Sequence, residues 1–231
     1  MTKKNNKVPT FDYSKKFSFS DVEKFDKHIS TQIRDYDRLF DSILSIADSF
    51  ILDGKRVYDI GCSTGFLIKT LASKYDSRKS EYVGIDINSN FSKLFIDTDN
   101  IKFHKADITR GYNFTDASLV LSLFTLQFID PKDRLKVLDS VASSLDDGYG
   151  FIIAEKTYPD SAFAYKVLES ASSDYKTDFY SDTEILADER SLRDIMRPFT
   201  EERLISELKE RFSSVSTIWS YFNFRAFMCI K

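Results

Sequence analysis

The sequence predicts an α/β fold with a seven-stranded, mostly parallel sheet that closes with an antiparallel hairpin. Apolar runs suited to buried strands alternate with amphipathic helical patterns between residues 57 and 155, and this alternation is typical of parallel sheets with right-handed crossovers. The first three apolar runs each end close to an acid, and a loop with two glycines follows the first. Such a pattern predicts a ligand site at the carboxyl ends of the strands.

The composition is that of one globular domain over residues 1–231. Of these residues, 42% are hydrophobic and 30% charged, and the net charge of −3 gives no global basic field, so we expect no direct nucleic-acid partner. No apolar run approaches the length of a membrane span. Cys62 and Cys229 provide neither a disulfide framework nor metal-ligand spacing. We therefore expect a cytoplasmic protein with no membrane partner, no metal and a flexible tail over residues 1–15.

Two helical segments come before the first strand. Residues 20–23 have the capping-box pattern, and the helix behind them is expected to run to about Ile33. A second amphipathic pattern is broken at Asp53 and Gly54. Part of this segment should cover the ligand crevice. Tyr36, at its start, is either a residue of that crevice or a plain core aromatic.

The loop after the first apolar run has the features of a cofactor-binding turn. Gly61 and Gly65 let the backbone approach a ligand without a Cβ, and the helix that follows aims free N–H groups into the loop. Cys62 and Ser63 fill the turn, whereas a dinucleotide site has Gly-x-Gly-x-x-Gly. With Asp59 two residues before the first glycine, the loop resembles the first motif of S-adenosylmethionine (SAM) dependent methyltransferases, in which this acid helps to anchor the cationic methionine end.

Acids also end the second and third predicted strands. Asp86 comes roughly twenty residues after the glycines, where a doubly wound fold places its ribose-binding carboxylate, so we assign it to the ribose. Asp107 and Ile108 follow the run that begins at Ile101, and in the SAM-dependent fold this position commonly contacts the adenine amino group. The alternative interpretation is that each acid only caps the helix or turn that follows it.

The remaining strands come from the second half of the chain. Residues 117–124 form the most apolar run and suit a central fourth strand, and residues 150–155 supply the fifth, with a helix from Pro131 between them. Two β-type runs, 215–219 and 222–230, complete the sheet as a hairpin.

Residues 160–198 interrupt the alternation with polar, helical sequence. We interpret this insertion as a lid or an oligomer contact. Its arginines, Arg190, Arg193 and Arg197, either face solvent or bring one guanidinium to a ligand carboxylate, which that group can bind with two hydrogen bonds.

A set of short motifs is spread along the chain: residues 17–19 (Phe-Ser-Phe), 26–30 (Asp-Lys-His-Ile-Ser) with Tyr36, 59–63 (Asp-Ile-Gly-Cys-Ser), 124–128 (Phe-Thr-Leu-Gln-Phe), Glu155-Lys156, Arg190-Ser191 and 222–224 (Phe-Asn-Phe). In this combination the chain resembles the carboxy-S-adenosylmethionine synthase family from about residue 17 to residue 231. The resemblance implies a Rossmann-like class I methyltransferase fold. It also implies transfer of a carboxylate from prephenate to the SAM methyl carbon, which gives carboxy-SAM for a tRNA wobble-uridine modifying enzyme.

The resemblance further implies which residues form the site. Arg190 matches an arginine that binds the added carboxylate and comes, in the family, from the neighbouring subunit, so we expect a homodimer. Ile87 and Leu123 depart from the family, which has asparagine at both positions, the second close to the reacting methyl group. With the acid and second glycine of the loop included, the residues expected to bind SAM or carboxy-SAM are Tyr36, Asp59, Gly61, Cys62, Ser63, Gly65, Asp86, Ile87, Asp107, Ile108 and Leu123.

Three functions stay open from the sequence. The first is carboxyl transfer to SAM with prephenate as the small-molecule substrate. The second is an ordinary SAM-dependent methyltransferase acting on a small molecule, a protein or an RNA, since the Asn/Asp-Pro-Pro-Tyr and Pro-Cys motifs of DNA methylation are absent. The third is an inert interaction protein that kept the SAM fold. Leu123 favours the second or third function, whereas the glycine loop and the three acids favour an enzyme.

Overall fold

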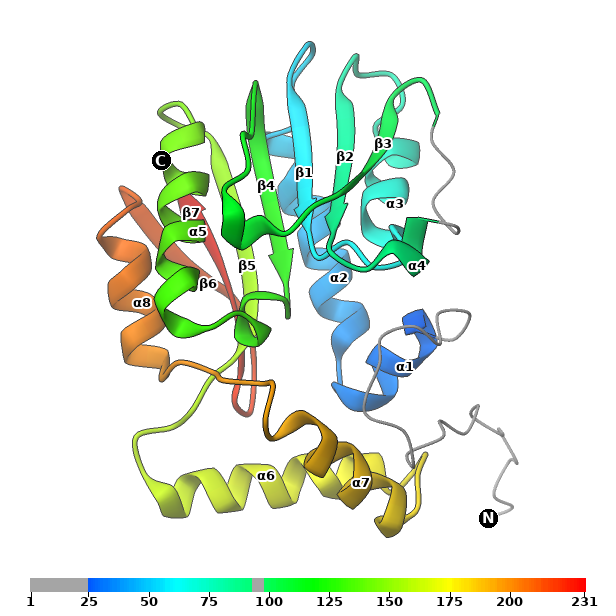
Figure 1. The fold of residues 1–231 in the computed structure, drawn as a ribbon, viewed down its shortest axis with the longest axis vertical. Coiled ribbons are helices and arrows are strands. Elements are labelled where there is room, and N and C mark those ends of the chain that lie inside the picture. Colours follow the sequence, from blue (N-terminus) through cyan, green and yellow to red (C-terminus); the bar gives the residue numbers. More distant parts are fainter. Residues whose placement is uncertain (1–24, 93–97) are drawn as a thin grey trace.

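The computed structural model describes residues 25–92 and 98–231 (Figure 1). The predicted tail, the capping box at residues 20–23 and the first motif of the resemblance lie outside these ranges.

One sheet forms the centre of the protein. Its strands are β1 Arg56–Ile60, β2 Glu81–Asp86, β3 Ile101–Lys105, β4 Ala117–Leu123, β5 Gly150–Lys156, β6 Ser214–Tyr221 and β7 Phe224–Ile230, in the spatial order β3-β2-β1-β4-β5-β7-β6. Strands β1 to β5 pair in parallel, and β7 is antiparallel to both β5 and β6. The predicted sheet and closing hairpin are thereby confirmed. The strand order reverses between β1 and β4, and ligands bind beyond the carboxyl ends of the strands at such a switch point.

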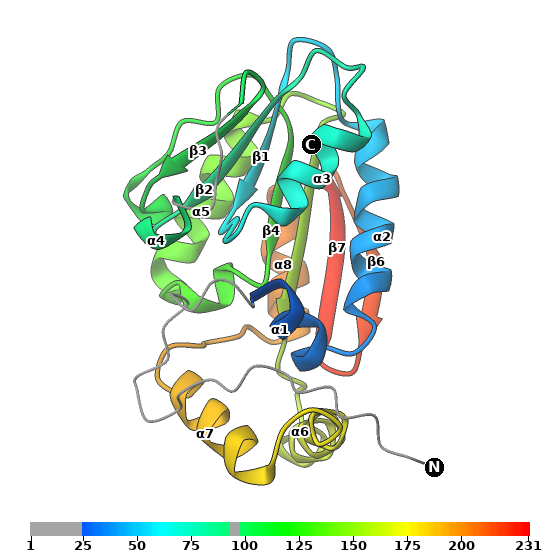
Figure 2. The same cartoon turned by 90° about the vertical axis from the view of Figure 1, so that its right-hand side faces the viewer.

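Helices cover both faces of the sheet (Figure 2). The α-helices of the described ranges are α1 Phe25–Gln32, α2 Tyr36–Ile46, α3 Phe66–Lys74, α4 Ser89–Ser92, α5 Pro131–Ser144, α6 Ala162–Lys176, α7 Asp182–Leu192 and α8 Glu201–Lys209. Short 3₁₀ turns are η2 Ala47–Ser49, η3 Ile108–Arg110 and η4 Leu126–Phe128. None of these helices is long and apolar enough to cross a membrane.

The core is divided into two layers by the sheet. In β4, Leu119 and Leu121 pack with α2 and α3 on one face, while Val120 packs with α5 and α8 on the other. Side chains of successive strand residues point to opposite faces, so a strand between two helical layers is apolar at nearly every position. This explains why residues 117–123 read as one continuous apolar run.

The insertion consists of α6 and α7, which lie beyond the carboxyl ends of β4 and β5 and beside α1 (Figures 1 and 2). The phenol of Tyr175 donates to the Ser30 carbonyl at 2.8 Å, and the hydroxyls of Tyr180 and Thr31 are 2.6 Å apart. These contacts join the insertion directly to α1.

Two of the strand boundaries that differ from those expected from sequence have a clear cause in the backbone. β4 ends one residue early because Phe124 has a φ of 53°, in the left-handed region that a strand does not use. Phe222 has a φ of 46° and lies in the hairpin turn, so β7 begins at Phe224 rather than at Phe222.

Candidate functional site

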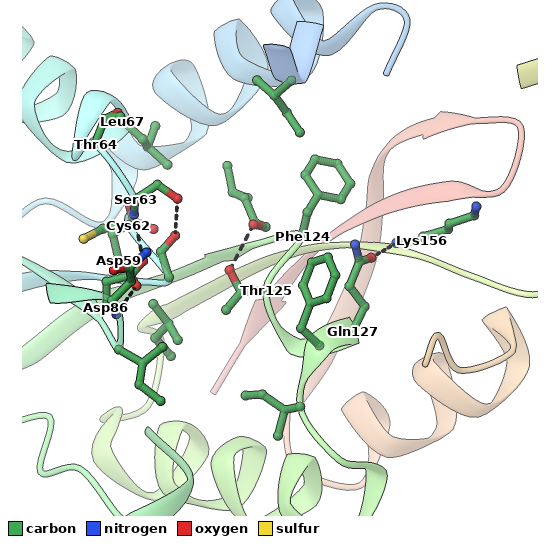
Figure 3. A pocket seen from close by; sticks show the side chains of 18 of the residues that line it. Asp59, Cys62, Ser63, Thr64, Leu67, Asp86, Phe124, Thr125, Gln127 and Lys156 are labelled. Carbon is green, nitrogen blue, oxygen red and sulfur yellow. Dashed lines mark hydrogen bonds between the residues drawn. The ribbon is translucent and has the colours of Figure 1, made fainter. Parts of the chain in front are cut away.

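A cavity of about 830 Å³ opens at the carboxyl ends of β1, β2 and β4, between the sheet, α1, α2 and the insertion (Figure 3). Ten of the twelve site residues expected from sequence line it: Tyr36, Asp59, Gly61, Cys62, Ser63, Asp86, Ile87, Asp107, Ile108 and Leu123. Gly65 lies just outside the lining and is the N-cap residue of α3. Arg190 is exposed on α7 and does not line the cavity of its own chain.

The glycine loop forms one wall of the cavity. Gly61 has a φ of 73°, and a Cβ at this position would collide with the Thr125 side chain, whose own Cβ would be only 2.9 Å away. The N–H groups of Gly61 and Cys62 both donate to the Ile85 carbonyl, at 2.7 and 3.0 Å. A side chain at Gly61 therefore has no room, because the loop is fixed to β2 on one side and meets the turn after β4 on the other.

Asp86 ends β2 and lines the cavity next to this loop. Its Oδ2 accepts the Ser63 N–H at 3.0 Å, and its Oδ1 accepts the Asn88 N–H at 2.9 Å. Burial raises the pKa of Asp86, and these backbone hydrogen bonds oppose that effect. Each carboxylate oxygen has two acceptor sites, so the group can accept ligand hydroxyls while the backbone holds it in place.

Asp59 is the second buried acid at this end of the cavity. Its exposed fraction is 4%, and no described cationic side chain forms an ion pair with it or with Asp86. Burial, together with the nearby charge of Asp86, raises the pKa of Asp59 to about 8. Two buried carboxyls without a cationic partner favour a positively charged ligand, and the sulfonium and ammonium groups of SAM meet that requirement.

Asp107 caps a turn and also lines the cavity. It caps η3, where its Oδ1 accepts the Thr109 hydroxyl at 2.7 Å and its Oδ2 accepts the Arg110 Nε at 3.1 Å. The Thr109 hydrogen bonds, with Arg110, hold the pKa of this carboxyl below its usual value. Asp107 and Ile108 also line the cavity, so capping the turn does not remove the acid from the site.

The turn after β4 contributes residues that the sequence did not assign to the site. Phe124, Thr125 and Gln127 line the middle of the cavity (Figure 3). The buried carboxyl of Glu155 accepts the Leu126 N–H at 2.9 Å, and burial raises its pKa to about 8. The only sequence signal for these residues was the motif at 124–128, which belonged to the resemblance.

Aromatic rings form the wall between α2 and this turn. The rings of Tyr36 and Phe124 are 6.3 Å apart, and Phe40 stacks on Phe66 at 5.1 Å. Tyr36 both packs against the core and lines the cavity, so the two interpretations of this residue hold together. An electron-rich aromatic face also suits a cationic sulfonium.

Cys62 lines the cavity, but its thiol is not a good candidate for a nucleophile. Burial raises the pKa of its thiol well above the usual value, and a protonated thiol is a poor nucleophile. In the part of the chain that the structure describes, no group of three or more His, Cys, Asp or Glu side chains is placed to hold a metal ion.

Comparison with known proteins indicates the methyltransferase class. A methyltransferase domain family matches residues 57–148. The fold resembles human N-acetylserotonin methyltransferase in complex with SAM, with a TM-score of 0.60 and 14% identity over 93% of this chain and 56% of that longer chain. It also resembles PigF with S-adenosylhomocysteine, with a TM-score of 0.60 and 13% identity over 95% and 60% of the two chains.

Two curated relatives are named carboxy-S-adenosyl-L-methionine synthase. The protein from Staphylococcus epidermidis is 28% identical over 91% of this chain and 93% of its own length. The protein from Shewanella amazonensis is 30% identical over 90% of this chain and 88% of its own length.

The fold and the site define a SAM-dependent enzyme with the class I methyltransferase fold, and SAM is its cofactor or substrate. Within that class, the chain belongs to the carboxy-S-adenosyl-L-methionine synthase family. An inert interaction protein is therefore no longer a candidate.

Replacing Gly61 with alanine should weaken SAM binding at least tenfold, because the new Cβ collides with Thr125. Gly54 is the matched control: its φ is 74°, but a Cβ added there would meet no atom within 4 Å. Gly54→Ala should therefore show only the strain of about 1 kcal/mol for a left-handed alanine. Calorimetric titration with SAM and thermal melts separate the two effects. A Gly61→Ala variant that binds SAM within twofold of wild type contradicts this account of the loop.

Binding of SAM at pH 7 should release close to one proton from Asp59. With a pKa of about 8 the free carboxyl is mostly protonated at pH 7, and a cationic ligand favours its ionised form. SAM affinity should therefore rise as the pH increases from 6 to 7.5. Calorimetry in buffers of different ionisation enthalpy measures the proton release, which Asp59→Asn should abolish. Equal proton release by wild type and variant would assign the proton to another group.

Proposed function

We propose that this protein makes carboxy-SAM by moving a carboxyl group from prephenate to the methyl carbon of SAM. The observation that carries the proposal is the family membership: relatives named for carboxy-SAM synthesis align along about nine tenths of this chain. Prephenate as the donor follows from the family resemblance. The product would serve a tRNA wobble-uridine modifying enzyme, which gives the protein a cytoplasmic place of action.

The proposed reaction requires the protein mainly to bind its two ligands. Bound SAM supplies a methyl group whose protons are made acidic by the sulfonium. When prephenate loses carbon dioxide it also releases hydroxide, which removes one methyl proton and becomes water. The methyl carbon then forms a bond to the carbon dioxide. The chain must hold two ligands in line, keep carbon dioxide from escaping and exclude bulk water. The enclosed position of the cavity between the sheet, α1 and the insertion supports these tasks.

The charge of the cavity supports a site shared by two copies. Its described lining contains eight aspartates but only two lysines, which suits cationic SAM better than an anionic donor. Arg190 is exposed on α7 and has no hydrogen bond or ion pair with a described residue. We propose that Arg190 of a second copy supplies the missing positive charge for the carboxylate of carboxy-SAM.

The insertion, residues 160–198, is the proposed contact between the copies of this single-domain chain. No residue of α6 is buried, although the helix has 15 residues. Phe163 and Val167, one helical turn apart, are 76% and 48% exposed. Large apolar side chains that line up on one exposed face favour a protein contact, and α7, which carries Arg190, belongs to the same insertion.

An ordinary methyltransferase is the second candidate. Leu123 lines the cavity beside Phe124 and Thr125, where the family has a polar asparagine. An apolar group there suits methyl transfer, which needs only in-line alignment of an acceptor. No anion holder is required for that reaction, so the two candidates differ in their need for Arg190.

Replacing Arg190 with alanine should lower the affinity for carboxy-SAM ten- to a hundredfold, from the loss of a charged hydrogen-bonded pair worth roughly 1.5–3 kcal/mol. The affinity for SAM should change little, because its methyl group carries no anion. Arg190→Lys should restore part of the loss, since lysine lacks the planar fork. Arg193→Ala, an exposed neighbour in the insertion, is the matched control. Equal losses for both ligands would make Arg190 structural, and no loss for either would favour the methyltransferase.

Mixing two inactive variants tests whether the site is shared. Arg190→Ala keeps the pocket intact, and Asp86→Ala keeps Arg190, so a mixed dimer has one complete site only if Arg190 reaches the other copy. Co-expressed in equal amounts, the pair should recover about a quarter of the wild-type sites by random pairing. No recovery in a mixed dimer confirmed by mass would place Arg190 in its own chain.

A further inference from the structure

The eight aspartates that line the cavity are unevenly distributed. Five come from α2, β1 and the residues at the ends of β2 and β3: Asp37, Asp41, Asp59, Asp86 and Asp107. Asp130 and Asp133 lie at the start of α5, and Asp188 on α7 pairs with Lys176. Of the described lining residues, Lys156 and Lys176 alone carry a permanent positive charge, and they come from the last residues of β5 and α6. Figure 3 shows Lys156 on the opposite side from Ser63 and Asp86, with Phe124 and Gln127 between.

Lys156 is held firmly at this second end. Its backbone N–H donates to the Gln127 Oε1 at 2.8 Å, and its Nζ lies 2.8 Å from the Glu169 Oε1. The side chain is only 13% exposed. Glu169 also accepts the Asn223 Nδ2 at 2.9 Å, so it keeps a partner if Lys156 turns to a ligand. An ammonium group has three donors, and the ion pair with Glu169 occupies one.

Lys176 lines the cavity from the insertion. Its Nζ is 3.6 Å from the Asp188 Oδ2, and the two side chains are 15% and 4% exposed. That distance is too long for a strong hydrogen bond, so the ammonium group has donor capacity left for a ligand. Lys156 belongs to the sheet and Lys176 to the insertion. An anion between them would draw the insertion onto the core.

The two ion pairs could serve only to fasten the insertion to the core. Two observations speak against a purely structural role: both lysines line the cavity, and neither pair uses all the donors of its ammonium group. The aspartates at the other end repel an anionic donor. Among the described lining residues, these two lysines are therefore the groups that can attract the carboxylate of such a donor within one chain.

Which carboxylate binds there follows from the reaction. Prephenate has one carboxylate that leaves as carbon dioxide and one, on the 2-oxo acid side chain, that stays in the product. Strong binding of the leaving carboxylate would stabilise the ground state and slow its loss. A lysine pair that holds the retained carboxylate anchors the donor without this cost and leaves the other carboxylate near the SAM methyl group.

We propose that Lys156 and Lys176 form a subsite for the retained 2-oxo acid carboxylate of the donor. This inference rests on the proposed function for the identity of the donor. It implies that phenylpyruvate, the 2-oxo acid left after prephenate loses carbon dioxide and hydroxide, binds the same two lysines. The enzyme is then inhibited by its own product in competition with prephenate.

Titration of the SAM-loaded protein with phenylpyruvate tests the subsite without turnover. Because removal of a lysine alone would leave a buried carboxylate unpaired, the variants are Lys156→Met with Glu169→Gln and Lys176→Met with Asp188→Asn. Each should lower the affinity for phenylpyruvate and for prephenate at least tenfold and leave SAM affinity within twofold. Glu169→Gln and Asp188→Asn alone keep the lysine and remove its competing carboxylate, so they should bind phenylpyruvate at least as tightly as wild type does. Lys166→Met, at an exposed position of α6, is the control and should bind it as wild type does. Lys156→Arg should restore part of the binding.

The outcomes are distinct. Unchanged phenylpyruvate affinity in the lysine variants, or no binding of phenylpyruvate to wild type at millimolar concentration, overturns the subsite. Loss of prephenate affinity alone would show that the lysines hold the leaving carboxylate, which also overturns it. Lysine-dependent binding of phenylpyruvate by a protein that makes no carboxy-SAM from prephenate supports the subsite and refutes the proposed function.

Discussion

Two buried carboxyl groups that have no cationic partner among the described residues determine how this cavity can be used. Asp59 and Asp86 meet beside the glycine loop, where parallel strands end at the switch point of the sheet. Their mutual repulsion and their burial are costly in the free protein, as the raised pKa of Asp59 indicates. A ligand with sulfonium and ammonium groups removes that cost. The absence of space beside Gly61 and the aromatic wall at Tyr36 then fix how closely such a ligand approaches.

The other wall of the cavity is joined to the insertion through the core. The guanidinium of Arg134 lies between the turn after β4 and the end of the insertion, and its Nη2 donates to the carbonyls of Ile129 at 2.9 Å and Arg197 at 2.8 Å. The Arg197 N–H donates to the Gln127 carbonyl at 2.7 Å. Movement of the insertion is thus transmitted to the turn that Glu155 holds. This connection gives a physical reason why a donor bound between sheet and insertion would affect the geometry near the methyl group.

Much of the fold and of the SAM end of the site was predictable from local sequence. Strand-end acids such as Asp86 and a glycine loop with Gly61 are local patterns, and the buried strands are continuous apolar runs. The left-handed backbone conformation of Phe124 has no such signal, because a bulky side chain does not predict a positive φ. Lys156 and Lys176 line one cavity only through the tertiary fold. Arg190 lies on an exposed helix face, and the role that we propose for it in a second copy cannot be predicted from a pattern within one chain.

The central claim is that the donor's carboxyl group ends on the methyl carbon of SAM. It is tested most directly with prephenate that carries carbon-13 in its ring carboxylate, incubated with SAM and the protein and followed by mass spectrometry. The account predicts a sulfonium product that has gained a labelled carboxyl group, together with unlabelled phenylpyruvate. Intact prephenate beside S-adenosylhomocysteine and a methylated acceptor would contradict it and make the protein a methyltransferase.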